Sequence, residues 1–78
     1  MIVTDTREAR QAIRLWMYEV LEERGETIAS LAESLHMSRA NLHRICAGHS
    51  APRLTSLIEI ADGLGYDIDL GFVKRGDG

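Results

Sequence analysis

Residues 27–48 constrain the fold more than any other stretch of this 78-residue chain. Apolar residues recur at helical spacing before and after a short break. The two stripes consist of Leu31, Ala32 and Leu35, and of Leu42 and Ile45. Ser38 precedes the second stripe, where a hydroxyl can accept from the free backbone N–H groups of a new helix. Only His36 and Met37 are left to form a turn, so the stretch predicts a helix-turn-helix over about residues 27–47.

The outward face of the second helix carries side chains that suit DNA recognition. If the apolar stripe points into the core, five residues point outward, namely Arg39, Ala40, Asn41, His43 and Arg44. Arginine can donate two hydrogen bonds to guanine, asparagine can pair with adenine, and a small side chain can touch a thymine methyl. We expect these residues to contact bases in the major groove. The alternative is an ordinary solvated helix face that happens to carry two arginines.

The motif continues in a pattern that reaches the end of the next predicted helix. The residues that carry the pattern are Thr27, Leu31-Ala32-Glu33, Leu35, Met37-Ser38-Arg39, Leu42, Arg44-Ile45, Gly48, Pro52, Leu54, Leu57, Ile60-Ala61 and Leu64-Gly65. In these positions the chain resembles the Cro and phage-repressor (xenobiotic-response-element-like) helix-turn-helix family of small transcriptional regulators. The resemblance implies a mainly α-helical, compact four-helix lambda-repressor-like domain over residues 1–78 that binds double-stranded DNA.

Three positions depart from the family pattern. Ile28 stands where the family usually has a glutamine that contacts a phosphate, so that contact would come from Thr27, Ser30 or a backbone N–H. His36 replaces the turn glycine, which predicts modest strain if the backbone there is left-handed. Cys46 replaces a glutamate near the end of the second helix and is expected to remove an acidic group from the DNA side.

The charge distribution agrees with a DNA-binding face better than the net charge of −3 does. Residues 34–58 contain no acid, but three arginines and three histidines. Residues 1–33 contain seven acids and four bases, and residues 59–78 contain five acids and two bases. Because phosphate affinity depends on the local field, the acid-free window supports DNA binding with a weak non-specific component.

Two further helices are predicted around the motif. An apolar 3–4 repeat predicts a helix over about Arg7–Arg24, capped by Asp5 or Thr6 and ended by Gly25. Its inner face consists of Ala9, Ala12, Ile13, Trp16, Met17, Val20 and Leu21. A helix over about Leu54–Leu64 is expected to pack one apolar set on the core, namely Leu54, Leu57, Ile58, Ala61 and Leu64.

The loop before the last helix and the starts of the two motif helices supply candidates for contacts with the DNA backbone. Polar side chains and a helix N-terminus suit a phosphate, and such contacts fix register without reading sequence. The candidate positioning residues are Thr27, Ser38, Ser50 and Arg53, with His49 beside them. For Ser50 a plain loop position is the alternative.

Residues 66–73 alternate strictly between apolar and other side chains, which predicts a β-strand. Its apolar side consists of Tyr66, Ile68, Leu70 and Phe72. A lone strand is not stable, so it needs either Ile2-Val3-Thr4 or, more economically, the same strand of a second subunit. Some repressors and antitoxins of the family dimerise in this way. The resemblance therefore implies a homodimer that reads a roughly palindromic site.

Two other functions stand beside a repressor-like regulator. An antitoxin would keep the DNA-binding core, bind a toxin protein and autoregulate its operon. A metal-responsive regulator would use His43, Cys46 and His49 as ligands, with His36 as a fourth, although structural zinc sites are usually richer in cysteine. No catalytic constellation or phosphate loop is present, so neither enzymatic activity nor a cofactor is expected.

The sequence also predicts a cytoplasmic protein, associated with the nucleoid when bound to DNA. It contains no apolar run of about 18 residues and no secretory signal. Its single cysteine cannot form an internal disulfide, which fits a reducing compartment.

Overall fold

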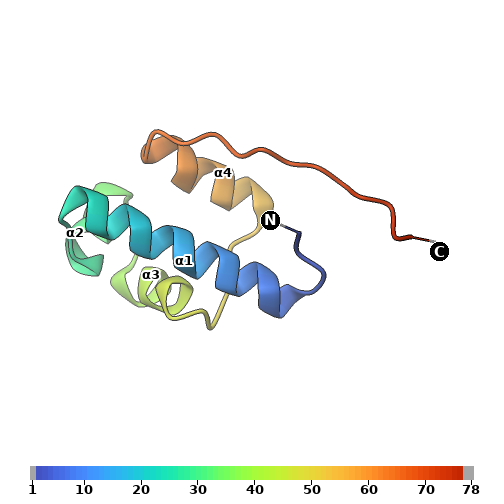
Figure 1. The fold of residues 1–78 in the computed structure, drawn as a ribbon. Helices are drawn as coiled ribbons and strands as arrows, with labels where there is room; N and C mark the ends of the chain where they lie inside the picture. Colours follow the sequence, from blue (N-terminus) through green and yellow to red (C-terminus); the bar gives the residue numbers. More distant parts are fainter. Residues whose placement is uncertain (1, 77–78) are drawn as a thin grey trace.

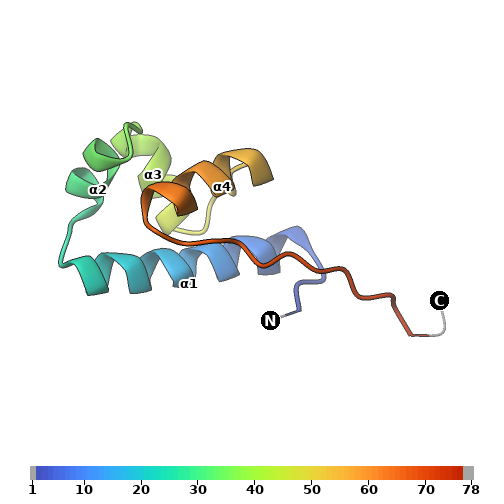
Figure 2. The same ribbon diagram turned by 90° about the horizontal axis from the view of Figure 1, so that it is seen from above.

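The computed structural model describes residues 2–76, which form four α-helices (Figure 1). The helices are α1 (Thr6–Arg24), α2 (Ile28–Ser34), α3 (Arg39–Cys46) and α4 (Leu54–Gly63). Figure 2 shows α2, α3 and α4 on one side of the long helix α1. The predicted mainly helical architecture is confirmed for this part of the chain. Helix α1 begins one residue earlier than predicted, and α4 ends one residue earlier.

The first three helices each begin at a side-chain cap. Asp5 accepts a hydrogen bond from the backbone N of Glu8 at 2.8 Å. Thr27 accepts from the N of Ser30 at 3.1 Å, and Ser30 Oγ accepts in return from the N of Thr27 at 3.1 Å. Ser38 accepts from the N of Asn41 at 3.1 Å. Such caps satisfy N–H groups that have no partner within the helix, which fixes where each helix starts.

Helix α2 ends in a left-handed residue that is not glycine. His36 has a φ of 56°, and it is the one non-glycine residue with positive φ within residues 2–76. Its N–H donates to the carbonyl of Glu33 at 3.2 Å, and the N–H of Met37 donates to the carbonyl of Ala32 at 2.8 Å. This pair of bonds is a Schellman ending, which normally uses glycine at the left-handed position. The condition stated for strain at His36, a left-handed backbone, is thus met.

We expect His36→Gly to stabilise the protein. Relief of left-handed strain is worth about 1–2 kcal/mol, and the greater freedom of glycine in the unfolded chain offsets about 0.4–1 kcal/mol of it. The net gain in the free energy of unfolding should be about 0.5–1 kcal/mol in urea titrations. His43→Gly, in the exposed middle of α3, is the matched control and should lose about 0.5–1 kcal/mol. A loss for both variants would contradict strain at His36.

The core lies where α1, α2, α3 and α4 meet. Its buried apolar residues are Met17, Val20, Leu31, Ala32, Leu42, Ile45, Cys46, Ile60, Ala61 and Leu64. Trp16 packs against this cluster without being fully buried. The prediction for α4 was partly wrong, because Leu54 and Ile58 are 45% and 50% exposed. Ile60, Ala61 and Leu64 lie on one helix face. Leu54 is the first residue of α4, and Ile58 lies at the edge of that face.

The chain after α4 is extended and leaves the helical body. Tyr66 holds its start: the Tyr66 ring meets the Trp16 ring edge-on at 5.3 Å between centroids, and the Tyr66 hydroxyl donates to Glu23 at 3.1 Å. Figure 2 shows this tail running beside α1 and past its first turn. No strand forms within residues 2–76, and no backbone hydrogen bond joins residues 2–4 to residues 66–76. The strand over 66–73 and its pairing therefore stay predictions.

Candidate DNA-binding surface

Helix α3 presents two faces of opposite character. Its inner face is closed: Leu42, Ile45 and Cys46 are at most 2% exposed. All five residues predicted to contact bases lie on the exposed surface, namely Arg39, Ala40, Asn41, His43 and Arg44. Helix α3 packs against both α1 and α2, which supports it from behind. An exposed, rigidly backed helix with this residue content has the shape and chemistry to enter a major groove.

Cys46 corrects one expectation. The thiol lies in the core at 1% exposure rather than on the DNA side, so the loss of a glutamate there does not change the charge facing DNA. Burial raises the pKa of the Cys46 thiol above its ordinary value of 9.0, because the thiolate would lose its hydration.

We expect the buried thiol to resist alkylation. At pH 8 the folded protein should react with iodoacetamide at least about 100-fold more slowly than the urea-unfolded chain, since reaction must await opening of the core. The raised pKa also predicts how the free energy of unfolding depends on pH. Above pH 9 the unfolded thiol ionises while the folded one does not, so the free energy of unfolding falls there. Cys46→Ala should reduce that fall. Equal alkylation rates in the folded and unfolded states would contradict the burial.

The residues predicted to hold the DNA backbone lie at three helix starts and one loop. Thr27 and Ser38 are exposed and cap α2 and α3 through their hydroxyl oxygens. Because Ser38 uses its oxygen as an acceptor, its O–H remains available to donate outward. Ser50 is half-buried in the loop after α3, and Arg53 is exposed at the start of α4.

The start of α4 differs from the other three helix starts. Arg53 occupies the N-cap position and makes no side-chain cap hydrogen bond. Within residues 2–76 the first N–H groups of α4 therefore lack a side-chain cap, and they lie beside an arginine. Free N–H groups and the positive end of the helix dipole favour an anion at this position.

A shallow apolar hollow separates the starts of α2 and α3. It has a volume of about 360 Å³ and is lined by Ile28, Ala29, Arg39, Ala40 and His43. Ile28, which replaces the family's glutamine, packs its side chain against the core and forms part of this lining. The hollow beside α3 is therefore largely apolar, and it is large enough to admit a sugar or a methyl group.

The sequence analysis did not predict that α1 borders the candidate DNA-binding surface. A Cβ placed on Gly48 would lie 3.1 Å from Cδ of Arg14 and 3.4 Å from Nε2 of Gln11, so both α1 side chains touch the loop after α3. Gly48 has a φ of 77° and leaves room for this approach. A signal for the arrangement exists, because Arg7, Arg10 and Arg14 fall at helical spacing in the first half of α1, away from its later glutamates.

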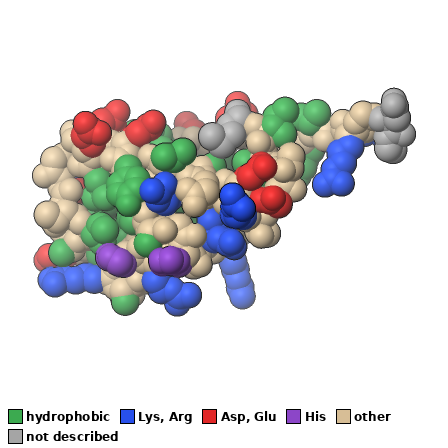
Figure 3. Space-filling model, turned by 60° about the horizontal axis from the view of Figure 1, so that its bottom comes forward, with side chains coloured by type: hydrophobic (Ala, Val, Ile, Leu, Met, Phe, Trp, Pro, Cys, Tyr) green, Lys and Arg blue, Asp and Glu red, His purple; other side chains and the backbone are tan. Residues whose placement is uncertain are grey.

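The charges segregate on the folded molecule. In Figure 3 the purple His and most of the blue basic side chains lie over the lower and middle part of one face, while further blue side chains lie on the tail at the right. The acid-free residues 34–58 include the turn, all of α3 and the loop before α4. Acids flank this region on the helices around it. The local field at α3 is therefore positive despite the negative total.

The described residues do not support a metal centre. Within residues 2–76 no group of three His, Cys, Asp or Glu side chains is placed to hold a metal ion. His43 and His49 are exposed while Cys46 is buried in the core, which separates the proposed ligands. In the same part of the chain, no helix has the length and apolarity needed to cross a membrane.

Fold and surface together define a helix-turn-helix domain whose second helix faces solvent. A family model described as helix-turn-helix matches residues 17–70, from the middle of α1 to the tail. The match covers more than half of the chain, which therefore belongs to the Cro/C1-type helix-turn-helix family of DNA-binding transcription regulators. No curated protein and no solved structure matches the chain significantly.

Proposed function

We propose that residues 1–78 form one domain that acts as a sequence-specific, repressor-like transcriptional regulator. Helix α3 enters the major groove and reads bases through Arg39, Ala40, Asn41, His43 and Arg44. The observation that carries this proposal is the outward set of these five side chains on a helix whose other face is fully buried. Such a helix holds side chains that can hydrogen-bond to guanine and adenine in a fixed position relative to the domain.

Backbone contacts set the register in this proposal. Ser38 donates to a phosphate from the start of α3. Thr27 does so from the start of α2 when its O–H turns from Ser30 Oγ, to which it donates at 3.3 Å in the free protein. Ser50 and Arg53 donate beside the uncapped start of α4. The absence of a side-chain cap at Arg53 supports this role, because a phosphate oxygen would satisfy the same N–H groups. These contacts add affinity without selecting a sequence.

The operator is palindromic because the regulator is a homodimer. Tyr66, Ile68, Leu70 and Phe72 form the dimerising face of the tail, which pairs antiparallel with the tail of a second copy. Support comes from the extended tail with its unpaired backbone and exposed apolar residues. Two-fold symmetry then places two α3 helices in successive major grooves about one helical turn apart.

The experiment is a fluorescence-anisotropy titration against the DNA upstream of the chain's own gene, at two salt concentrations. We expect tight binding that survives an excess of random DNA and weakens as salt rises, because phosphate contacts release counterions. Footprinting should then reveal two related half-sites. Binding that random DNA removes completely would reject a sequence-specific autoregulator.

An antitoxin is the second candidate, favoured by the outer face of α1. Leu15 and Tyr18 are 50% and 46% exposed there, and Glu19, Glu22 and Glu23 are exposed beside them. Acids edge one side of this apolar patch, and Arg14 lies on the other with its guanidinium 5.1 Å from the Tyr18 ring centroid. The acidic side suits a basic protein partner. Co-purification with the product of the neighbouring gene tests this, with Tyr18→Glu as the disrupting variant and His49→Ala as the control. If neither variant changes recovery of the neighbour, α1 is not the docking face.

A further inference from the structure

The apolar side chains of the tail become more exposed along the chain. Tyr66 is 36% exposed and Ile68 is half-buried, whereas Leu70 is 56% and Phe72 is 92% exposed. These four residues lie on the same side of the extended chain because side chains alternate with a period of two. The first half of this face therefore covers its own domain, and the second half continues past the helices beside Ile2 and Val3.

The backbone of the tail is unpaired as well. Within residues 66–76 the backbone hydrogen bond that forms is from the N of Tyr66 to the carbonyl of Ala61, at 2.8 Å. From Asp67 onward no backbone group in this described segment bonds to another backbone group. An extended segment with free N–H and C=O groups is an edge that a second strand can join.

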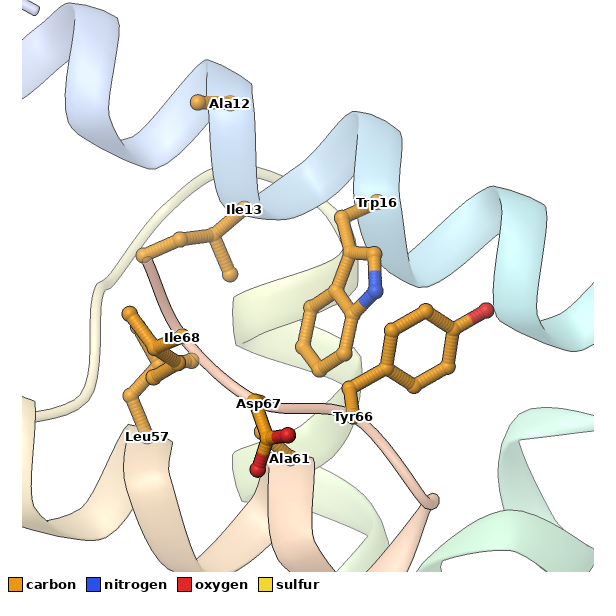
Figure 4. A pocket seen from close by; sticks show the side chains of 8 residues that line it. All are labelled: Ala12, Ile13, Trp16, Leu57, Ala61, Tyr66, Asp67 and Ile68. Carbon is orange, nitrogen blue, oxygen red and sulfur yellow. The ribbon is translucent and has the colours of Figure 1, made fainter. Parts of the chain in front are cut away.

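An apolar groove lies directly beside the covered half of the tail. It has a volume of about 330 Å³ and separates α1 from α4 (Figure 4). Ala12, Ile13 and Trp16 line it from α1, Leu57 lines it from α4, and Ile68 borders it from the tail. The small side chain of Ala12 leaves space that no residue from 2 to 76 of the same copy fills. Open apolar space of this size can take an aromatic ring.

The charges of the tail favour antiparallel pairing with the tail of a second copy. The tail starts with Asp67 and Asp69 and continues to Lys74 and Arg75. A parallel pair would place like charges side by side, whereas an antiparallel pair brings the basic end of one tail to the acidic start of the other. An axis at Asp69 would oppose two acids directly. An axis at Leu70 avoids this contact.

We propose that two copies pair their tails antiparallel about a two-fold axis at Leu70, so that Phe72 of each copy closes the groove between α1 and α4 of the other. In this register Phe72 lies opposite Ile68, on the side that faces the groove. Lys74 lies opposite Tyr66, whose hydroxyl is bonded to Glu23 at 3.1 Å. Each tail thus covers its own domain first and its partner's domain second. This inference rests on the homodimer proposed above.

Phe72→Ala tests the groove, with Val73→Ala as the matched control. Val73 is also exposed, at 76%, but lies on the opposite side of the tail with the acids. By analytical ultracentrifugation, Phe72→Ala should raise the dimer dissociation constant by about 10- to 100-fold, because two buried rings lose their contacts. Val73→Ala should change it by less than about threefold. Circular dichroism should show unchanged helix content for both variants.

Trp16 gives an independent readout, because it is the single tryptophan of the chain and lines the groove. On concentrating the wild type through its dimerisation range, we expect the Trp16 emission to shift to the blue as the second copy excludes water. The shift should persist in Val73→Ala and disappear in Phe72→Ala compared at equal dimer fraction.

The outcomes separate this inference from the proposed function. Dimerisation that Phe72→Ala and Val73→Ala weaken equally, or an emission shift that survives Phe72→Ala, overturns the groove contact alone. A wild type that stays monomeric overturns both the groove contact and the dimeric operator reading. Failure to prefer the upstream DNA despite a normal dimer and a normal shift overturns the regulator and leaves the groove contact standing.

Discussion

Replacing Leu42 by alanine should lower the free energy of unfolding by about 2–5 kcal/mol. Leu42 is completely buried, and it is the inner anchor of the helix that carries the candidate base contacts. The substitution removes apolar contact and leaves a cavity that α1 and α2 cannot close, because both pack against α3. For a chain of 78 residues such a loss approaches the whole stability. Urea titration followed by circular dichroism measures it.

Leu54→Ala is the matched control for this substitution. Leu54 is 45% exposed on α4, so the same chemical change should cost less than about 1 kcal/mol. A comparable loss at both positions would contradict the described core. The DNA affinity of Leu42→Ala, measured well below its unfolding midpoint, should also fall, because α3 would lose its fixed orientation.

Arg44→Ala should weaken binding to the preferred DNA site by about 1–3 kcal/mol and relax selectivity at one base pair. The residue is exposed on α3, on the side away from the buried stripe, so little loss of stability should accompany the change. Competition titrations against sites carrying single base substitutions will show which position loses its preference.

Arg53→Ala is the informative comparison for Arg44→Ala. Its side chain lies at the start of α4 and is expected to contact a phosphate, so binding to all sequences should weaken alike. The slope of log affinity against log salt should decrease by about one. If both variants lose specific and random binding in the same proportion, the division between base and backbone contacts is wrong.

The sequence predicts the helix-turn-helix well because local and global signals agree there. Thr27 and Ser38 mark helix starts, and the apolar stripes fix which face is buried. The error at Cys46 came from giving the family pattern more weight than spacing. Leu42, Ile45 and Cys46 stand at i, i+3 and i+4, which is the pattern of one inward stripe.

In helix α4 sequence periodicity does not predict which apolar residues are buried. Its apolar residues form a broad face opposite Thr55, Ser56, Glu59 and Asp62, and periodicity does not show which part of that face is covered. Packing against the rest of the domain selects Ile60, Ala61 and Leu64, and leaves Leu54 and Ile58 in solvent. The tail is a similar case, since its alternation specifies a strand but a single chain supplies no neighbour for it. The contact of Arg14 with the loop at Gly48 depends on tertiary packing, and the helical spacing of Arg7, Arg10 and Arg14 indicates only that they share one side of α1.

The separation of acidic and basic surfaces has a consequence for how the protein searches a genome. A net charge of −3 repels the duplex at long range, while the acid-free side attracts it at short range. For the regulator proposed above, we therefore expect encounters to be productive in one orientation and residence on random sequence to be brief. We expect such a molecule to reach its site by many short hops rather than by long sliding runs, with few copies bound to competing DNA.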